Sequence, residues 1–419
     1  MPQKTDYVYV GLDIHKETHT AVLMTYMEER LGKIKITNNI AGYRRLQAYV
    51  DKFRGELIPL YGLEDVSHYG RDLAIYLLDQ DYTVKEVNSA LSCMERNSYA
   101  TVKKSDEWDA QCISAVLSRR SAILPDANPQ DYYWTMKHLV GRRDALVKNT
   151  SSLIQQFHEQ IQKQYPSYKQ FFHDIECQTS LAFFERFPST GHLNGVTVEE
   201  LGAFLREKSH NTCSDKRAEL ILKLVEQDHT KEREYQSGRD LILQSISRQV
   251  YFNQQEIKQL ERMQGELLKE LGYHLETIPG ISTVTASALV AHIGDIKRFK
   301  NADKLANYAG VAPICHSSAG KGKDLQNKGM GNRNLYNVLY LLAMQQIQVN
   351  KDGTARNPLL RAYFECKVSQ GKTKIQAMIC IMRRLVSIIY RIMKNQTPYQ
   401  MPEVESPKEQ IFLNKNVVD

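Results

Sequence analysis

The sequence lacks the patterns of exported, membrane-spanning and disulfide-bonded proteins. No uncharged apolar run is long enough to cross a bilayer, so no transmembrane helix is expected. The N-terminus carries no signal-peptide pattern. The seven cysteines are odd in number and widely spaced, and no two have the CxxC spacing of a zinc or redox site. We therefore expect a soluble, intracellular protein without disulfide bonds or structural zinc.

Positive charge is in only mild excess. The chain has 55 lysine and arginine residues against 48 aspartate and glutamate residues, and a net charge of +7 does not by itself indicate a nucleic-acid partner. The placement of the charge is more informative, because residues 351–394 contain ten basic residues and only two acidic ones. Such a local excess attracts phosphate groups. With 419 residues, the chain is long enough for two or three domains.

The N-terminal part of the chain alternates between strand-like and helix-like patterns. β-branched and aromatic residues, or a polar period of two, mark the strands. Strands are predicted at residues 7–12, 18–26, 33–36, 57–63 and 83–87, and helices at residues 43–53 and 71–78. Three strands before the first helix indicate an RNase H-like order, since a Rossmann sheet alternates from its beginning and carries a GxGxxG motif that this sequence lacks after its first strand. We predict an α/β domain of RNase H-like fold over residues 1–125.

A long and polar helical region is predicted over residues 126–272. Leucines recur every seven residues near its start, and its end largely follows the alternating three-and-four spacing of a coiled coil. The residues with this spacing are Leu139, Leu146, Leu153, Ile246, Val250, Ile257, Leu260, Leu267 and Leu271. Two long helices with a smaller element between them are therefore expected. They form either an antiparallel hairpin within one chain or an arm that joins protomers into a dimer or tetramer.

The rest of the chain is predicted to be a mainly α C-terminal domain over residues 273–396, with a loose tail over residues 397–419. Its first segment has the pattern of a helix, a tight Pro-Gly turn and a second helix, like a helix-hairpin-helix element. Gly280 in the turn would let backbone N–H groups approach a phosphate. The basic residues that follow favour this interpretation, and they include Lys297, Arg298 and Lys300. The alternative is an ordinary turn between packed helices.

Four carboxylates fall where a metal site could assemble. Asp13 and Glu64 each end a predicted strand, so adjacent strands would bring both to one edge of the sheet. Asp106 and Asp109 are three residues apart at the start of a predicted helix and share one face. Converging carboxylates repel one another unless divalent cations neutralise them, and oxygen ligands favour Mg²⁺ or Mn²⁺. Each residue alone is more often a turn or cap residue, but their order and spacing together favour a metal site.

Two serines lie in a predicted loop of small residues and lysines. Ser317 and Ser318 precede Lys321 and Lys323, and the loop leads to Arg333 in a Gly-Asn-Arg-Asn-Leu segment. A serine hydroxyl needs a base, a metal or nearby cations to act as a nucleophile. The residues by themselves therefore favour phosphate binding by this loop.

These two sets of motifs resemble the insertion-sequence transposases of the IS110 family. The N-terminal set comprises residues 11–16, Glu64 with Gly70 and Leu73 behind it, and residues 104–110. It is similar to the family's DEDD domain, which is itself similar to the junction resolvase RuvC; Ser105 stands where the family usually has threonine. Residues 278–389 resemble the family's second domain, in which proline is followed by Ser-Ser-Gly and a basic Gly-Asn-Arg segment. Ala319 replaces the glycine of that motif, which leaves the register of the serines open.

The resemblance implies a DNA transposase or recombinase with a RuvC-like catalytic domain. It implies that Asp13, Glu64, Asp106 and Asp109 bind the metal, and that Ser318, or else Ser317, attacks DNA and forms a phosphoserine link. The implied partners are the DNA ends of the element, a target DNA and a structured guide RNA encoded by the element. The implied location is the bacterial cytoplasm, at the nucleoid. Two alternatives stay open: a metal-dependent junction nuclease without a covalent intermediate, and a non-catalytic nucleic-acid-binding relative of transposases.

Overall fold

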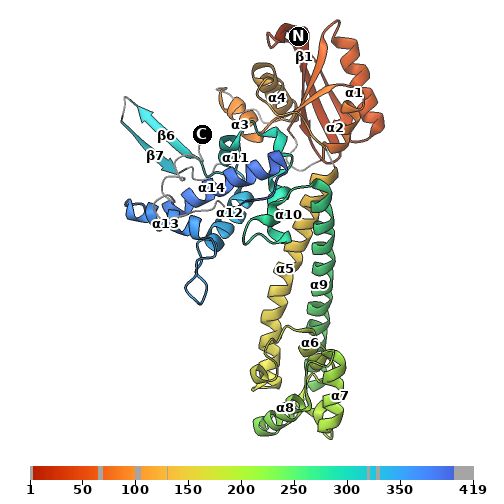
Figure 1. Ribbon diagram of the computed structural model, residues 1–419. Helices are drawn as coiled ribbons and strands as arrows, with labels where there is room; N and C mark the ends of the chain where they lie inside the picture. The colour runs from red at the N-terminus through yellow and green to blue at the C-terminus, as the bar shows by residue number, and fades with distance from the viewer. Residues whose placement is uncertain are drawn as a thin grey trace. The chain divides into compact units, whose positions relative to one another are not determined.

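The computed structural model describes residues 3–64, 69–99, 105–129, 131–318, 321–326 and 331–400, with only the backbone described for Asp131 and for residues 313–318 and 321–326 (Figure 1). The chain divides into two compact units. The first contains residues 1–131 together with 297–300, and the second contains residues 132–296 and 301–419. No helix of the described residues is long and apolar enough to cross a membrane.

A five-stranded mixed sheet forms the centre of the first unit. Its strands are β1 (Tyr7–Ile14), β2 (Thr18–Met24), β3 (Arg30–Thr37), β4 (Ile58–Glu64) and β5 (Thr83–Glu86). They lie in the order β3-β2-β1-β4-β5. The first three strands are antiparallel neighbours, whereas β4 pairs in parallel with both β1 and β5. The predicted mixed α/β domain, with three strands before its first helix, is confirmed.

Helices cover both faces of this sheet. They are α1 (Ile40–Phe53), α2 (Arg71–Leu78), α3 (Ser89–Asn97) and α4 (Asp106–Arg120). On one face, Val8, Val10 and Leu12 of β1 pack with residues of α1 and α2. Helix α4 covers the other face (Figure 1), and there Tyr9 packs with residues of this helix. Because alternate residues of a strand face opposite sides, Asp13 and Glu64 belong to the α4 side of the sheet.

A glycine lets α4 lie directly on β1. A Cβ atom at Gly11 would collide with backbone atoms of Ala110 and Ser114 on α4. The Gly11 N–H instead donates to Ser114 Oγ at 2.8 Å, and Ser114 Oγ donates to the carbonyl of Val22 at 2.8 Å. This buried serine therefore ties α4 to β1 and β2, and it sets how close the beginning of α4 comes to the end of β1.

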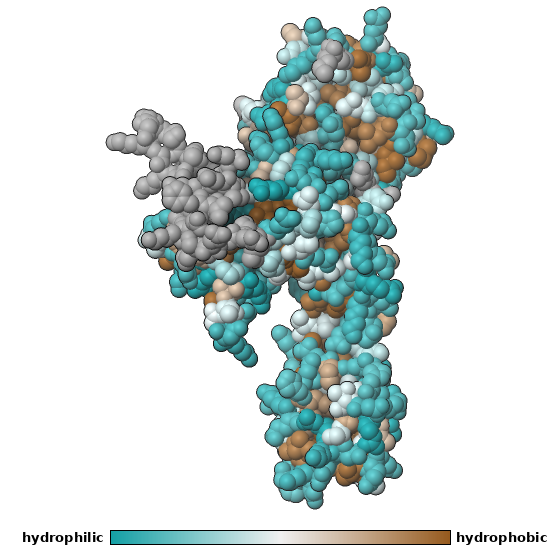
Figure 2. All heavy atoms as spheres, in the orientation of Figure 1, coloured by the Kyte–Doolittle hydropathy of each residue, from teal (hydrophilic) through white to brown (hydrophobic). Residues whose placement is uncertain are grey.

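Two long helices dominate the second unit. They are α5 (Asp131–Gln164) and α9 (Gln236–Leu271), and they run antiparallel within the chain. Arg143 and Glu261 form an ion pair between them at 2.9 Å, and Gln236 donates to Gln164 at 3.1 Å near their far ends. Within the chain the arms thus form the antiparallel hairpin that was the first expected arrangement, and the joining of protomers by these arms stays a prediction. In the view of Figure 2, hydrophilic residues cover most of the surface of these paired helices.

The seam predicted on α9 matches the buried residues only in part. Ile246 and Val250 are buried in one hydrophobic cluster with Leu153, Phe157 and Ile161 of α5. Further along α9 the buried side chains are Asn253, Gln264 and Leu268, whereas Leu260 and Leu267 are half-buried. The leucine spacing alone therefore does not identify the face of α9 that packs in this half of the helix.

A cluster of aromatic residues fills the far end of the two arms. Helices α6 (Gln178–Arg186), α7 (Val198–Lys208) and α8 (Asp215–Asp228) fold there between α5 and α9. The rings of Phe183 and Phe184 lie 5.1 Å apart and contact Phe157, Tyr165 and Phe171. These three helices are the smaller element that the sequence predicts between the arms.

The remaining part of the second unit is mainly helical. Its helices are α10 (Thr283–Ile293), α11 (Ala302–Tyr308), α12 (Arg333–Gln346), α13 (Pro358–Ser369) and α14 (Lys374–Asn395), and α14 packs on α11, α12 and α13. The segment predicted as a serine-containing loop instead forms an antiparallel hairpin of β6 (Pro313–Ser318) and β7 (Lys321–Gln326). The pairing satisfies the backbone groups of this segment, which a loop would leave to water.

Candidate active site

The structure brings the four predicted carboxylates together. The register of β1 and β4 places Asp13 directly beside Glu64 at the end of both strands. Helix α4 begins above them, with Ser105 as its N-cap, and supplies Asp106 and Asp109. Side chains of Asp13, Glu64 and Asp109 are 14%, 11% and 13% exposed, whereas Asp106 is 45% exposed. The cluster is thus partly enclosed and opens to solvent at Asp106.

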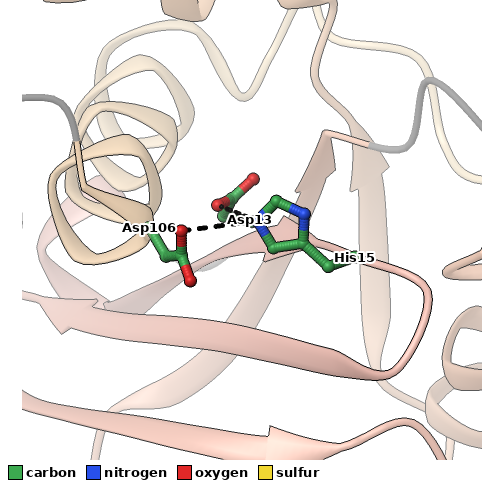
Figure 3. A group of neighbouring side chains, drawn as sticks. All are labelled: Asp13, His15 and Asp106. Atoms are coloured by element: carbon green, nitrogen blue, oxygen red, sulfur yellow. Dashed lines mark hydrogen bonds and ion pairs between the residues drawn. The ribbon is translucent and has the colours of Figure 1, made fainter.

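A histidine that the motifs did not single out lies between two of the carboxylates. His15 Nε2 is 3.1 Å from Asp13 Oδ2 and 3.5 Å from Asp106 Oδ1 (Figure 3). One ligand atom from each of the three residues lies within 4.8 Å of the others, which is a spacing suited to a shared metal ion. The sequence did contain a signal for this contact. Asp13 and His15 are two residues apart, and residues with that spacing on an extended chain lie on the same face.

Helix α3 supplies partners for the other two carboxylates. Arg96 Nη1 lies 3.2 Å from Asp109 Oδ1 and 3.9 Å from Glu64 Oε2. The hydroxyl of Ser92 donates to Glu64 Oε2 at 2.5 Å. Neither residue belongs to a recognisable motif, and only the position of α3 beside α4 brings them to the site. Arg96 neutralises part of the negative charge of the cluster.

Basic residues of the edge strand β3 face the beginning of α4. Lys35 Nζ donates to Asp106 Oδ2 at 3.1 Å. Glu107, which the resemblance did not mark as a metal ligand, pairs instead with Arg30 at 2.6 Å and with Lys33 at 2.5 Å. These pairs hold the first turn of α4 against the sheet, with acidic residues at the positive end of the helix.

The electrostatics of the cluster are those of crowded negative charge. Burial has the largest effect on Asp13 and raises its pKa; His15 opposes this rise, and repulsion from Asp109, Asp106 and Glu64 adds to it. The hydrogen bond from Lys35 lowers the pKa of Asp106. One carboxylate thus resists ionisation while its neighbour is stabilised by a cation. A divalent cation would remove the repulsion at Asp13, and the oxygen ligands present fit Mg²⁺ or Mn²⁺.

The second candidate set lies in the C-terminal unit. The backbone register pairs Ser317 with Gly322 and Ser318 with Lys321 in the β6–β7 hairpin. The side chains of both serines, and of Lys321 and Lys323, lie outside the described part of the structure. Arg333 is exposed at the first position of α12. The hairpin and the carboxylate cluster belong to different units of the chain.

The Gly-Asn-Arg segment, which follows β7 in the sequence, fixes the beginning of α12. Asn332 caps α12 by accepting from the N–H of Leu335 at 3.0 Å, and its side chain donates to Tyr308 Oη at 3.0 Å. Gly331 has a φ of +107°, and a Cβ atom there would collide with the backbone of Gly310. The glycine and asparagine of this motif therefore have structural roles that the sequence alone did not reveal.

The Pro-Gly turn is packed against other helices of its unit. Gly280 has a φ of +82°, which favours glycine. The carbonyl of Pro279 accepts a hydrogen bond from the buried side chain of Gln346 on α12. The Pro-Gly turn therefore packs against α12 through this hydrogen bond. Lys297, Arg298 and Lys300 are exposed on the short segment that groups with the first unit.

Replacing Arg96 with methionine is expected to lower the free energy of unfolding by about 1–3 kcal/mol in the absence of metal, because Glu64 and Asp109 would lose the cation that pairs with them among the described residues. The destabilisation should shrink when Mg²⁺ is added, since the ion supplies the missing positive charge. Thermal denaturation in EDTA and in Mg²⁺ measures both values. Arg44→Met, at an exposed position of α1, is the control. An equal destabilisation in both buffers would show that Arg96 acts through packing alone.

A sheet whose parallel strands end in adjacent acidic residues, completed by two aspartates from a covering helix, defines a nuclease-like domain of the DEDD type. A family model for DEDD transposases of the IS110 type matches residues 10–166, and the model described as the transposase IS116/IS110/IS902 family matches residues 272–359. The chain belongs to this family of transposases.

Two curated relatives match most of the chain, and a third matches less than half of it. The uncharacterized protein of insertion element IS116 from Streptomyces clavuligerus is 22% identical over 399 residues, which cover 94% of this chain and 97% of that protein. The uncharacterized protein of insertion element IS900 from Mycobacterium paratuberculosis is also 22% identical, with the same coverage of both chains. The pilin gene-inverting protein of Moraxella lacunata is 30% identical over 199 residues, or 44% of this chain and 60% of that protein.

Proposed function

We propose that this chain cuts and rejoins DNA during transposition, with Mg²⁺ or Mn²⁺ held by Asp13, Glu64, Asp106 and Asp109. The observation that supports this most strongly is the pairing of Asp13 with Glu64 across β1 and β4, at the point where α4 adds its two aspartates. A strand end, a neighbouring strand end and a helix start, far apart in sequence, thus supply carboxylates to one small volume. Such a cluster is expected of a protein that uses metal to cut nucleic acid rather than of one that only binds it.

The carboxylates prepare the site for a phosphodiester. Bound divalent metal supplies positive charge that polarises the scissile phosphate and stabilises the leaving oxygen. Asp13 and Glu64 are held in place by the β1–β4 backbone pairing, and Asp109 by Arg96 and the packing of α4. His15 lies where it can orient Asp13 and Asp106 or exchange a proton at Nε2. The phosphate would bind at the exposed, Asp106 side of the cluster.

The nucleophile in this proposal is Ser318, with Ser317 as the alternative. The serine oxygen loses its proton and attacks the phosphorus, and the bond from phosphorus to the departing DNA oxygen breaks as that oxygen gains a proton. The phosphodiester to serine keeps the energy of the broken strand, so the reverse attack by a DNA hydroxyl rejoins the DNA without ATP. Lys321, Lys323 and Arg333 would bind flanking phosphates.

The finer parts of the proposal concern partners and assembly. Relatives of this chain include insertion-element proteins and pilin gene-inverting proteins, so the rearrangement is either transposition or inversion. A guide RNA encoded by the element would select the DNA, and Gly280, Lys297, Arg298 and Lys300 would contact nucleic acid in the manner of a helix-hairpin-helix. The helical arms would join protomers through a coiled coil into a dimer or tetramer, in the cytoplasm at the nucleoid.

One observation favours a second function. The carboxylate cluster is assembled within the first unit, from residues 13 to 109, and contains neither Ser317 nor Ser318. A metal-dependent junction nuclease, which uses water as its nucleophile, would need no more than this. The two functions differ in whether the protein becomes linked to the DNA.

A strand-cleavage assay on DNA bearing the ends of the element tests the proposal. The full chain is incubated with that DNA, with and without RNA transcribed from the element's flanks, in Mg²⁺ or in EDTA. We expect cleavage in Mg²⁺ and none in EDTA. The cleaved samples should also show a DNA-linked protein band on a denaturing gel. Cleaved DNA without linked protein would establish the nuclease, and the absence of cleavage under every condition would contradict both.

A further inference from the structure

The free edge of the sheet carries a concentration of positive charge that the carboxylate chemistry does not require. Residues 30–53, which form β3 and α1, contain six basic residues and one acidic residue. A groove of about 520 Å³ lies along this edge. It is lined by Lys33, Ile34 and Lys35 of β3 and by Arg45, Ala48, Tyr49 and Lys52 of α1. We call these seven residues the edge groove.

The backbone of the edge groove is closed to a further β-strand. The N–H of Lys33 donates to the Tyr49 hydroxyl at 3.1 Å, and the carbonyl of Lys35 accepts from Arg45 Nη2 at 3.3 Å. Gly32 makes room for this arrangement, because a Cβ atom there would lie 2.7 Å from the Tyr49 hydroxyl. Side chains of α1 therefore satisfy the edge where an added strand would pair. What the edge offers a partner is charge rather than backbone hydrogen bonds.

Cationic groups of the groove are available to an anion. Within the described part of the chain, neither Arg45 nor Lys52 has an ion pair with a carboxylate, and both are exposed. Tyr49 and Phe53 add an aromatic wall, with ring centroids 4.6 Å apart and Phe53 37% exposed. Basic groups beside exposed aromatic rings are what single-stranded nucleic acid binds, with its phosphates and its bases respectively.

The edge groove and the carboxylate cluster have one residue of β3 in common. Lys35 lines the groove and at the same time donates to Asp106 Oδ2 at 3.1 Å. A strand whose scissile phosphate lies on the carboxylates would therefore place its neighbouring phosphates along β3. We propose that the edge groove binds the DNA strand that is being cut, on one side of the scissile phosphate. This inference rests on the proposed function, because it takes the bound strand to be the substrate.

Salt dependence of DNA binding tests the groove without requiring cleavage. The double variant Arg45→Gln/Lys52→Gln and the full-length wild type are titrated with DNA bearing the element ends, in EDTA, over a range of salt concentrations. The slope of log affinity against log salt should fall by about one for each phosphate that the variant no longer binds. Arg45→Lys/Lys52→Arg keeps the charge and should keep the slope. Lys216→Gln/Lys223→Gln, on exposed positions of α8, is the matched control and should leave it unchanged.

A photo-crosslinking residue at Ala48 provides a second measurement. It keeps Arg45 and Lys52, so a folding defect of the charge variants would not affect it. Ala48 lines the groove, and Gln80, exposed at the opposite edge of the sheet after α2, is the control position. With DNA and RNA labelled separately, we expect Ala48 to capture DNA within a few nucleotides of the cleaved phosphate, and Gln80 to capture none. Capture of RNA instead of DNA, or an unchanged salt slope in the glutamine variant, would overturn the proposal.

The outcomes separate this inference from the proposed function. If the wild type cleaves DNA while the glutamine variant keeps its slope and Ala48 captures no DNA, the groove is refuted and the carboxylate chemistry stands. If the wild type never cleaves but Ala48 captures the DNA and the slope falls, the groove is a DNA-binding surface and the proposed reaction fails. In that second case the lysines of β3 would serve binding alone.

Discussion

Asp13→Asn should abolish metal-dependent strand cleavage and, in the same protein, stabilise the metal-free fold. Asp13 lies beside Glu64 and is repelled by Asp106 and Asp109, so the amide removes a charge that only a bound cation would balance. Removing a metal ligand should cost at least about 10³-fold in cleavage rate, which corresponds to several kcal/mol of transition-state stabilisation. Cleavage of labelled DNA in Mg²⁺ measures the rate, and thermal denaturation in EDTA measures stability.

The stability part of this prediction has a direction with pH. The pKa of Asp13 is raised in the folded chain, so its ionisation disfavours the folded state. That cost is absent at pH values below the ordinary pKa of an aspartate and appears as the pH rises through the raised pKa. The stability advantage of Asp13→Asn over the wild type should therefore grow from acidic to neutral pH in EDTA.

Added Mg²⁺ should reverse the order of the two proteins. The ion binds the folded wild type and raises its melting temperature, whereas Asp13→Asn should respond weakly. Asp79→Asn, an exposed aspartate at the end of α2, is the matched control and should behave as the wild type does in both buffers. Equal stabilisation of Asp13→Asn and wild type by Mg²⁺ would mean that Asp13 is not a metal ligand.

Ser318→Ala should eliminate the DNA-linked protein band and reduce cleavage by up to about 10⁶-fold, the scale of removing a serine nucleophile. Ser317→Ala is the natural control, because the two residues are neighbours in β6. The assay is the denaturing gel of linked protein, run for both variants beside the wild type.

Each pattern on that gel has a distinct meaning. Absence of the band in Ser317→Ala alone would move the nucleophile by one residue and keep the mechanism. Linked protein in both single variants would require a nucleophile elsewhere in the chain. Cleavage that proceeds at the wild-type rate in both, with no linked protein in any lane, would contradict the covalent mechanism and favour hydrolysis at the carboxylate cluster.

Strand and helix patterns predicted the first unit well because its signals are local. Alternation within single strands gave the sheet, and strand ends gave Asp13 and Glu64. Their meeting with Asp106 and Asp109 could be expected because parallel neighbours end at one edge of a sheet. The roles of these four residues, and of the two serines, stay predictions that the variants above test.

The contacts that tune the site could not be predicted in the same way. Ser92 and Arg96 reach the carboxylates only because α3 packs against α4, and Lys35 only because β3 is an edge strand. Such contacts depend on the distance between elements, which residue spacing does not encode. The serine segment was predicted as a loop because glycine and lysine are frequent in loops, whereas its pairing as a hairpin depends on register between β6 and β7.

The absence of a side chain at Gly11 determines how far Asp106 and Asp109 of α4 lie from Asp13 of β1. Because α4 rests on β1 where a side chain is missing, even a methyl group at this position would push the helix outward and carry Asp106 and Asp109 with it. The distance between β1 and the beginning of α4, where the proposed metal site lies, is therefore set by Gly11, which is not itself one of the proposed metal ligands. Inherited changes in activity within such a domain can thus arise from its scaffold while every acidic residue is retained.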